Sequence, residues 1–144
     1  MALFLERGKR AFPEYQRHFA AGANASDWGE YRQVLRIPWP ASPRQGQLTA
    51  HFRGDCFEVA FFCPGLRGPA EWQIFGSPHD DSSLVAATLR WLADFFSGKI
   101  VVVVERYRRW WFSPYHLAFF RAAARQPFGK RVVRVMAWQR QSGR

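Results

Sequence analysis

Cysteine is scarce in this sequence, and the two cysteines stand where a disulfide between them is not feasible. Cys56 and Cys63 begin and end the stretch CFEVAFFC, which we expect to be one β-strand. Seven strand residues span about 23 Å, and an odd separation puts the two side chains on opposite faces. A disulfide needs Cα atoms within about 7 Å of each other. We therefore expect two free thiols that pack as small apolar residues.

Long apolar runs are also missing. No segment approaches the roughly 18 consecutive apolar residues of a membrane-spanning helix. The start of the chain, MALFLERGKR, has a short apolar stretch that ends at Glu6, so it lacks the apolar core of a signal peptide. We expect a cytoplasmic protein without a transmembrane segment. Because 48% of the residues are hydrophobic and 17% are aromatic, we also expect a packed core.

The sequence lacks the common catalytic and cofactor motifs. It contains no G-x-S-x-G, no Walker A loop, no H-E-x-x-H and no paired cysteine motif. The four histidines fall on four different predicted elements; they are His18, His51, His79 and His116. We therefore predict no catalytic residues, no metal site and no cofactor, and we expect that the protein is not an enzyme.

One dispersed arrangement keeps an enzymatic hypothesis open. His51 stands opposite Glu58 in the hairpin predicted below, although such a pair is usually sheet surface. A hydrolase site would need a further contribution from His116. Ser113 precedes His116 by three residues, but a role as a helix cap explains that serine. A hydrolase is therefore the weakest of the functional hypotheses.

Acidic residues are absent from the last part of the chain. Residues 1–105 carry 11 Lys and Arg and all 11 Asp and Glu, whereas residues 106–144 carry ten Lys and Arg and no acid. The whole net charge of +10 therefore belongs to residues 106–144, which we call the acid-free segment. An unbalanced basic block in a folded region is typical of a site for an anionic partner. Arginine outnumbers lysine 18 to 3, which a compositional bias also explains.

The order of the predicted elements indicates an α+β fold. We expect one domain over residues 1–144, with a helical or irregular part at 1–46 and a sheet with two helices at 47–144. The predicted order is (α)-β-β-β-α-β-α-β, with a mostly antiparallel sheet of about five strands and helices packed on it. Within the first part, Pro13 starts a helix and Gly22 ends it. The stretch SDWGEYRQVL is either a helix capped by Ser26 or the beginning of a strand.

The clearest local signal is a β-hairpin in GQLTAHFRGDCFEVAFFCPG. Gly54-Asp55 suits a two-residue turn, which fixes the register of the two strands by pairing Arg53 with Cys56. One face of the hairpin is then apolar, and it consists of Leu48, Ala50, Phe52, Phe57, Val59 and Phe61. The opposite face consists of Thr49, His51, Arg53, Ala60, Glu58 and Cys56. A third strand follows at residues 71–76.

Two helices and two strands complete the prediction. The first helix lies within residues 79–98, where Asp81 or Ser82 caps its start and Gly98 ends it. The strand that follows has an apolar run at 100–104, which is typical of a strand covered on both faces. We expect its exit and a turn over 105–112, a helix from Ser113-Pro114 to about Arg125, and a last strand within residues 130–140.

The basic residues of the acid-free segment form the predicted binding face. Arg121 and Arg125 are neighbours on one face of the second helix. In the last strand, we interpret the alternating set that contains Trp138 as the exposed one and the set Val133, Val135 and Ala137 as the core face. The predicted anion-binding residues are Arg106, Arg108, Arg121, Arg125, Arg134 and Arg140. The predicted aromatic contacts are Trp110 and Trp138.

These features predict a small binding module whose basic C-terminal face engages an anionic partner. Arginines beside aromatic rings serve single-stranded nucleic acid, since cations follow phosphates and rings stack on bases. The same residues also dominate protein interfaces. Nucleic acid is slightly favoured over an acidic protein surface. The alternative is a cytosolic inhibitor or immunity-type protein that binds a partner protein. Attachment to a membrane surface through residues 110–112 is a weaker hypothesis, since no amphipathic basic helix accompanies them.

Overall fold

The structure is a computed structural model, and it describes residues 1–19, 27–28, 31–39, 46–53, 55–62, 70–75, 80–105, 110–113 and 132–138. The elements follow one another along the chain as α1 (Ala2–Ala11), the 3₁₀ helix η1 (Pro13–His18), β1 (Asp27–Trp28), β2 (Tyr31–Pro38), β3 (Gln47–Phe52), β4 (Cys56–Phe62), β5 (Ala70–Phe75), α2 (Asp81–Phe96), β6 (Val101–Glu105), β7 (Trp110–Ser113) and β8 (Val132–Ala137).

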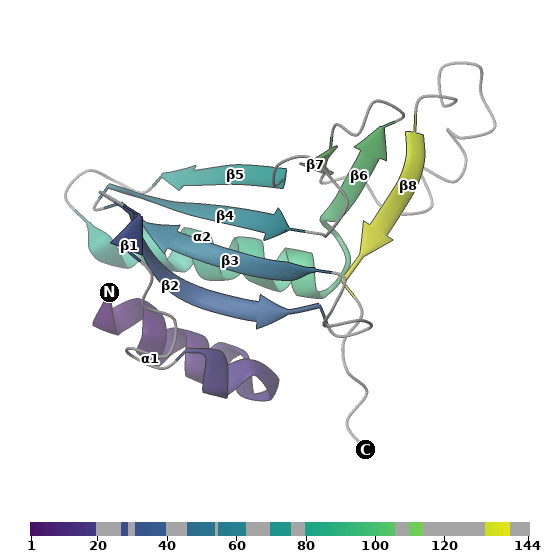
Figure 1. The fold of residues 1–144 in the computed structure, drawn as a ribbon. Helices are drawn as coiled ribbons and strands as arrows, with labels where there is room; N and C mark the ends of the chain where they lie inside the picture. Colours follow the sequence, from purple (N-terminus) through teal and green to yellow (C-terminus); the bar gives the residue numbers. More distant parts are fainter. Residues whose placement is uncertain are drawn as a thin grey trace.

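The structure confirms the α+β class and the order of the predicted elements. All strand pairs in the described part of the chain are antiparallel. A five-stranded sheet, sheet A, has the order β1-β2-β3-β4-β5, and a three-stranded sheet, sheet B, has the order β7-β6-β8. Figure 1 shows α2 crossing behind sheet A and α1 lying alongside β2, with sheet B at the end of sheet A. The predicted helix from Pro114 to Arg125 lies outside the described residues.

The hairpin of β3 and β4 has the register that its turn predicts. Phe52 pairs with Phe57, His51 with Glu58, and the pairing continues without a break to Gln47 and Phe62. The backbone N–H of Arg53 donates to the carbonyl of Cys56 at 3.0 Å, which closes the two-residue loop. Local alternation and turn chemistry were sufficient to predict this register, because all paired residues lie within one stretch of 16 residues.

The core lies between the apolar face of sheet A and the helices. Phe57, on β4, contacts Phe4 of α1 with a ring-centroid distance of 4.7 Å. Phe12, which follows α1, meets Phe96 of α2 edge-on at 5.0 Å. The 3₁₀ helix η1 occupies part of the stretch for which we predicted a helix ending at Gly22, and it ends earlier, at His18. Residues 31–38 form β2, so the strand interpretation of that region is the correct one.

Helix α2 begins earlier than either predicted cap implies, by one residue for Asp81 and by two for Ser82. Asp80 is the N-cap, and its carboxylate accepts a hydrogen bond from the backbone N–H of Ser82 at 2.8 Å. The prediction of Asp81 or Ser82 as the cap is therefore wrong, because only Asp80 stands outside the helix with extended backbone. Gly98 ends the helix region with a φ of 77°, the left-handed conformation that favours glycine.

Strand β6 is the central strand of sheet B, and it is covered on both faces, as its apolar run predicted. Val101, Val102 and Val103 are all buried, so both faces of the strand are covered. The strand ends at Glu105, and residues 110–113 form strand β7, which runs back along it with Val104 paired to Trp110. The prediction of a strand exit and a turn over 105–112 is therefore corrected, because residues 110–112 satisfy their backbone groups by pairing with β6.

Candidate functional site

The acid-free segment is built into the fold at two places. Strand β7 takes residues 110–113 from it, and strand β8 takes residues 132–137. Both pair with β6, one on each side. The only strand of sheet B from outside the segment is therefore the central one. The backbones of β7 and β8 are held by the ladders of hydrogen bonds along β6.

Trp138 anchors the end of this segment in the core. Its side chain is 3% exposed, and its indole N–H donates to the hydroxyl of Tyr15 at 2.8 Å. The ring also lies against Trp39, at a centroid distance of 5.1 Å, and against Phe95 and Phe96 of α2, each at 5.3 Å. A buried tryptophan whose N–H has a partner is fully accommodated by the protein itself. The prediction of Trp138 as an aromatic contact for a partner is therefore wrong.

The face of β8 is also corrected. Met136 and Trp138, which belong to the alternating set that we interpreted as exposed, are both buried. Ala137, from the set interpreted as the core face, is half-buried. Both sets contain apolar residues, so alternation alone could not distinguish them. The large ring surface of Trp138 decides the orientation, because its burial removes the most apolar area from water.

The structure places the backbone of two further predicted residues. Trp110 of β7 and Arg134 of β8 both pair with Val104 of β6, so their backbones share one row across sheet B. Tertiary structure thus brings together two predicted positions that lie 24 residues apart in the sequence. The other predicted anion-binding residues lie outside the described residues; they are Arg106, Arg108, Arg121, Arg125 and Arg140.

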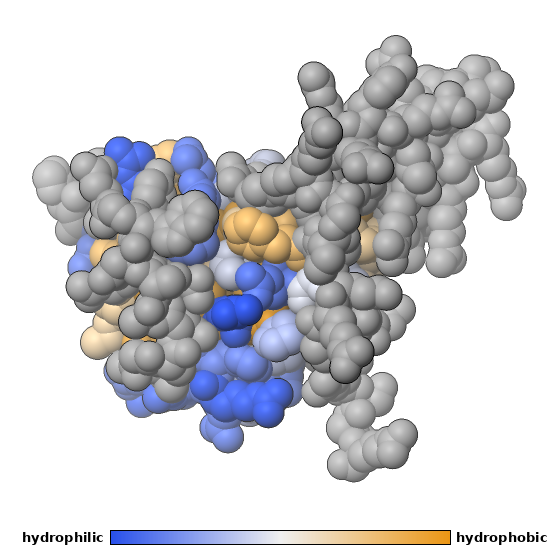
Figure 2. Space-filling view, in the orientation of Figure 1, coloured by the Kyte–Doolittle hydropathy of each residue, from blue (hydrophilic) through white to orange (hydrophobic). Residues whose placement is uncertain are grey.

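A second surface, with several polar residues, lies on the face of sheet A opposite the aromatic core, where Cys56 and Ala60 are also buried. Its middle row joins His51 of β3, Glu58 of β4 and Gln73 of β5, which pair across the three strands. The amide of Gln73 donates to the Glu58 carboxylate at 3.4 Å. On the same face, the guanidinium of Arg36 donates to Gln47 at 2.6 Å. In Figure 2, the uncovered atoms over β2 and β3 are mostly hydrophilic.

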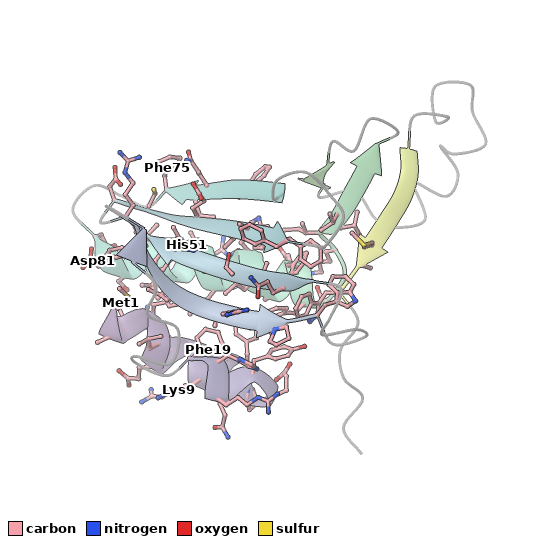
Figure 3. The ribbon with its side chains drawn as sticks, viewed as in Figure 1. Met1, Lys9, Phe19, His51, Phe75 and Asp81 are labelled. Carbon is pink, nitrogen blue, oxygen red and sulfur yellow. The ribbon has the colours of Figure 1, made fainter. Side chains whose placement is uncertain are left out.

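His51 has a shifted pKa on this surface. It is half-buried, and burial lowers its pKa from the ordinary value of 6.5, while the negative charge of Glu58 opposes that shift. The ring nitrogen Nδ1 is buried and lacks a hydrogen-bond partner among the described residues. Figure 3 shows His51 on β3 of sheet A. A neutral imidazole in this position can donate or accept a hydrogen bond but carries no charge for an anion.

The described residues of this face do not assemble an activated nucleophile. The hydroxyl of Thr49 is buried and donates to the carbonyl of Ala60 at 3.3 Å. Burial and the nearby Asp55 raise the pKa of the Cys56 thiol, which favours the unreactive protonated form. Within the described ranges, no group of three potential metal ligands occurs. His116, which the hydrolase hypothesis requires, lies outside them.

Sequence reasoning missed the exposed aromatic side chains of β4 and β5. Phe62 is 37% exposed, Trp72 is 45% exposed and Phe75 is 62% exposed. One signal was present in the sequence. Strand β5 reads AEWQIF, where Phe75 follows Ile74 and breaks the alternation of apolar and polar residues. Two adjacent apolar residues at a strand end cannot both face the same core.

Comparison of the chain with protein-family models, with curated proteins and with solved structures finds no match. Among the described residues, no helix combines the length and the apolar character needed to cross a membrane.

Proposed function

We propose that this protein is a non-enzymatic binding module whose acid-free segment engages an anionic partner, with nucleic acid ahead of an acidic protein surface. The observation that carries the proposal is the charge distribution. Residues 106–144 contain ten Lys and Arg and no acid, whereas the rest of the chain is neutral overall. Such an asymmetry attracts an anion to one part of the molecule and leaves the remainder without net attraction.

The attachment of the segment to the fold supports this proposal. Strands β7 and β8 both pair with β6, and Trp138 is buried against α2. A flexible basic tail loses conformational entropy when it binds, whereas charges on a folded scaffold have less to lose. Among the described residues, this advantage applies to Arg134, whose backbone is held in β8.

Binding of single-stranded oligonucleotides at several salt concentrations tests the proposal. If six or more phosphates are contacted, the affinity falls by about a thousandfold or more between roughly 50 and 200 mM salt. Each contact to a phosphate adds to the slope of log affinity against log salt. If neither DNA nor RNA of any tested sequence binds at low salt, nucleic acid is eliminated as the partner.

Charge-reversal variants locate the binding surface. Arg121→Glu with Arg125→Glu should abolish most of the binding and reduce the salt slope. The matched control is Lys9→Glu with Arg90→Glu, which changes the net charge equally at two exposed positions outside the segment. Equal losses in both double variants would show only a dependence on total charge. Unchanged binding in the first variant would place the contact elsewhere on the chain.

An acidic protein surface remains the alternative partner. Under this alternative, an acidic polypeptide should bind the unaltered chain at low salt, and oligonucleotides should not. The double variant at Arg121 and Arg125 should lose the binding of the polypeptide. The two partners are therefore distinguished by the same variants with two different probes.

A further inference from the structure

Strand β5 is the outer strand on one side of sheet A in the described part of the chain. It is six residues long and pairs with β4 in an unbroken register from Ala70 to Phe75. On the opposite side, β1 pairs only with Tyr31 and Arg32, so residues 33–38 of β2 also lack a described partner strand on their outer side. That edge differs from β5 because it contains a bulge between Gln33 and Leu35 and ends in Pro38. Figure 1 shows β5 as the outermost strand of sheet A, with β7 near its start.

The register determines which backbone groups of β5 face outward. Because Arg53 and Cys56 close the hairpin loop as a hydrogen-bonded pair, alternate residues of β4 bond to β3 and the others bond to β5. Phe57, Val59 and Phe61 of β4 therefore bond to β5, through Ile74, Trp72 and Ala70. The N–H and C=O groups of the remaining β5 residues point away from the sheet; these residues are Glu71, Gln73 and Phe75.

Apart from the charge of Glu71, this edge lacks the features that prevent strand association. Residues 70–75 contain neither lysine nor proline, and the pairing of β5 with β4 shows no bulge. Trp72 and Phe75 are two of the three large hydrophobic side chains exposed among the described residues. Figure 3 shows Phe75 at the end of β5. Unpaired backbone groups beside exposed aromatic rings are typical of an edge that another strand covers.

We propose that β5 is a dimer interface, in which β5 of a second copy of this chain pairs antiparallel across a two-fold axis at Gln73. The strand is complementary to itself in this register. Gln73 faces Gln73 of the second copy, Glu71 faces Phe75, and Trp72 faces Ile74, so no like charges are opposed and an apolar pair of Trp72 and Ile74 forms on each side of the axis. All three outward-facing residues then pair with residues of β5 in the second copy. The two copies of sheet A join into one continuous sheet.

The other symmetric registers satisfy fewer groups. An axis at Glu71 would oppose two acidic residues. An axis at Trp72 or at Ile74 would leave one outward-facing residue of β5 without a partner in the facing strand. The axis at Trp72 would also move the contact toward the start of β5, where β7 lies next to it.

Sedimentation of the full chain over a range of concentrations tests the dimer. A reversible monomer–dimer equilibrium is expected. Gln73→Lys should raise its dissociation constant by about tenfold or more, because two lysines would then face each other at the axis. Ala86→Lys, which adds the same charge at an exposed position on α2, should leave the constant unchanged. A purely monomeric wild-type chain, or equal effects of the two lysines, would refute the interface.

Cysteine cross-linking tests the register. In a hydrogen-bonded antiparallel pair, the Cα atoms are about 5.5 Å apart, a separation that a disulfide can bridge. Gln73→Cys should therefore form a covalent dimer on mild oxidation, above the background of the wild-type chain. Glu71→Cys should not, since its two copies would be offset by four residues, or about 13 Å. Cross-linking through position 71, or through neither position, would overturn the proposed register.

Discussion

The indole N–H of Trp138 donates a hydrogen bond to the hydroxyl of Tyr15 at 2.8 Å, across 123 residues of sequence. Both side chains are buried, at 3% and 4% exposure. The bond therefore joins the N-terminal 3₁₀ helix to the residue that follows the last strand. It also gives the acid-free segment a connection to the core that does not depend on sheet B.

Removal of the tyrosine hydroxyl should destabilise the protein. Tyr15→Phe leaves the buried indole N–H without this partner, which should lower the free energy of unfolding by about 1–3 kcal/mol. Urea unfolding monitored by tryptophan fluorescence measures the change. In a Trp138→Phe background the donor is absent, so the added cost of Tyr15→Phe should shrink. An equal cost in both backgrounds would show that the hydrogen bond is not responsible.

Gly8 of α1 is required by the ring of Phe19. A Cβ at this position would overlap Cδ1 and Cε1 of that ring, and Phe19 is fully buried. Gly8→Ala should lower the free energy of unfolding by about 1–3 kcal/mol, although alanine favours helix by about 1 kcal/mol. Phe19→Leu should cost less in the Gly8→Ala background than alone, because the smaller side chain makes room. A stabilised Gly8→Ala variant would contradict this packing.

The cap of α2 can be identified by alanine substitution. Asp80→Ala removes the carboxylate that accepts from the Ser82 N–H, and it should cost about 1 kcal/mol of stability. Asp81→Ala is the matched control, since it removes an equal charge from the first helical residue without removing the cap. Chemical denaturation of both variants distinguishes the two residues. A larger loss for Asp81→Ala would restore the cap that the sequence alone suggested.

Acid should destabilise the fold through its histidines. Burial is the main cause that lowers the pKa of both His18 and His51 below 6.5, so the unfolded chain binds protons more readily than the folded one. The free energy of unfolding should therefore fall as the pH falls below about 6.5. Unfolding in urea at several pH values between about 7.5 and 5.5 measures this slope.

A variant assigns part of the slope to His51. His51→Gln cannot be protonated, so its stability should depend less on pH over the same interval than that of the wild-type chain. His18 remains in the variant and should keep a residual slope of the same sign. An unchanged slope in His51→Gln would mean that the partly opposing charge of Glu58 cancels the effect of burial.

Where short-range interactions dominate, the sequence predicted the structure in detail. The β3–β4 hairpin depends on a two-residue turn and on alternation, both of which act between neighbouring residues. The apolar face of α2 follows from helical spacing, because Val85, Leu89, Leu92 and Phe96 recur at intervals of three or four residues. Leu89 is partly buried, and the other three are buried. The Asp80 cap was missed because three consecutive polar residues, Asp80, Asp81 and Ser82, can each act as an N-cap. Which of them does so depends on where the helix begins.

The candidate site was less predictable. The basic composition of residues 106–144 is plain in the sequence, but composition does not say which side chains the core takes. Trp138 has the same residue type as a partner-binding aromatic, and only its contacts with Tyr15, Trp39 and α2 identify it as a core residue. The open edge at β5 is likewise invisible until the order of the strands is known.

By itself, the sequence determined the α+β class, the register of the hairpin, the burial of β6 on both faces and the concentration of net charge in the acid-free segment. Each of these follows from turn chemistry, periodicity or residue counts, which are properties of short stretches or of the whole chain. Tertiary structure decided which face of β8 is buried, which strands are neighbours and which edges are left open. Those choices depend on contacts between distant residues, whose free energy is gained only when the whole core forms.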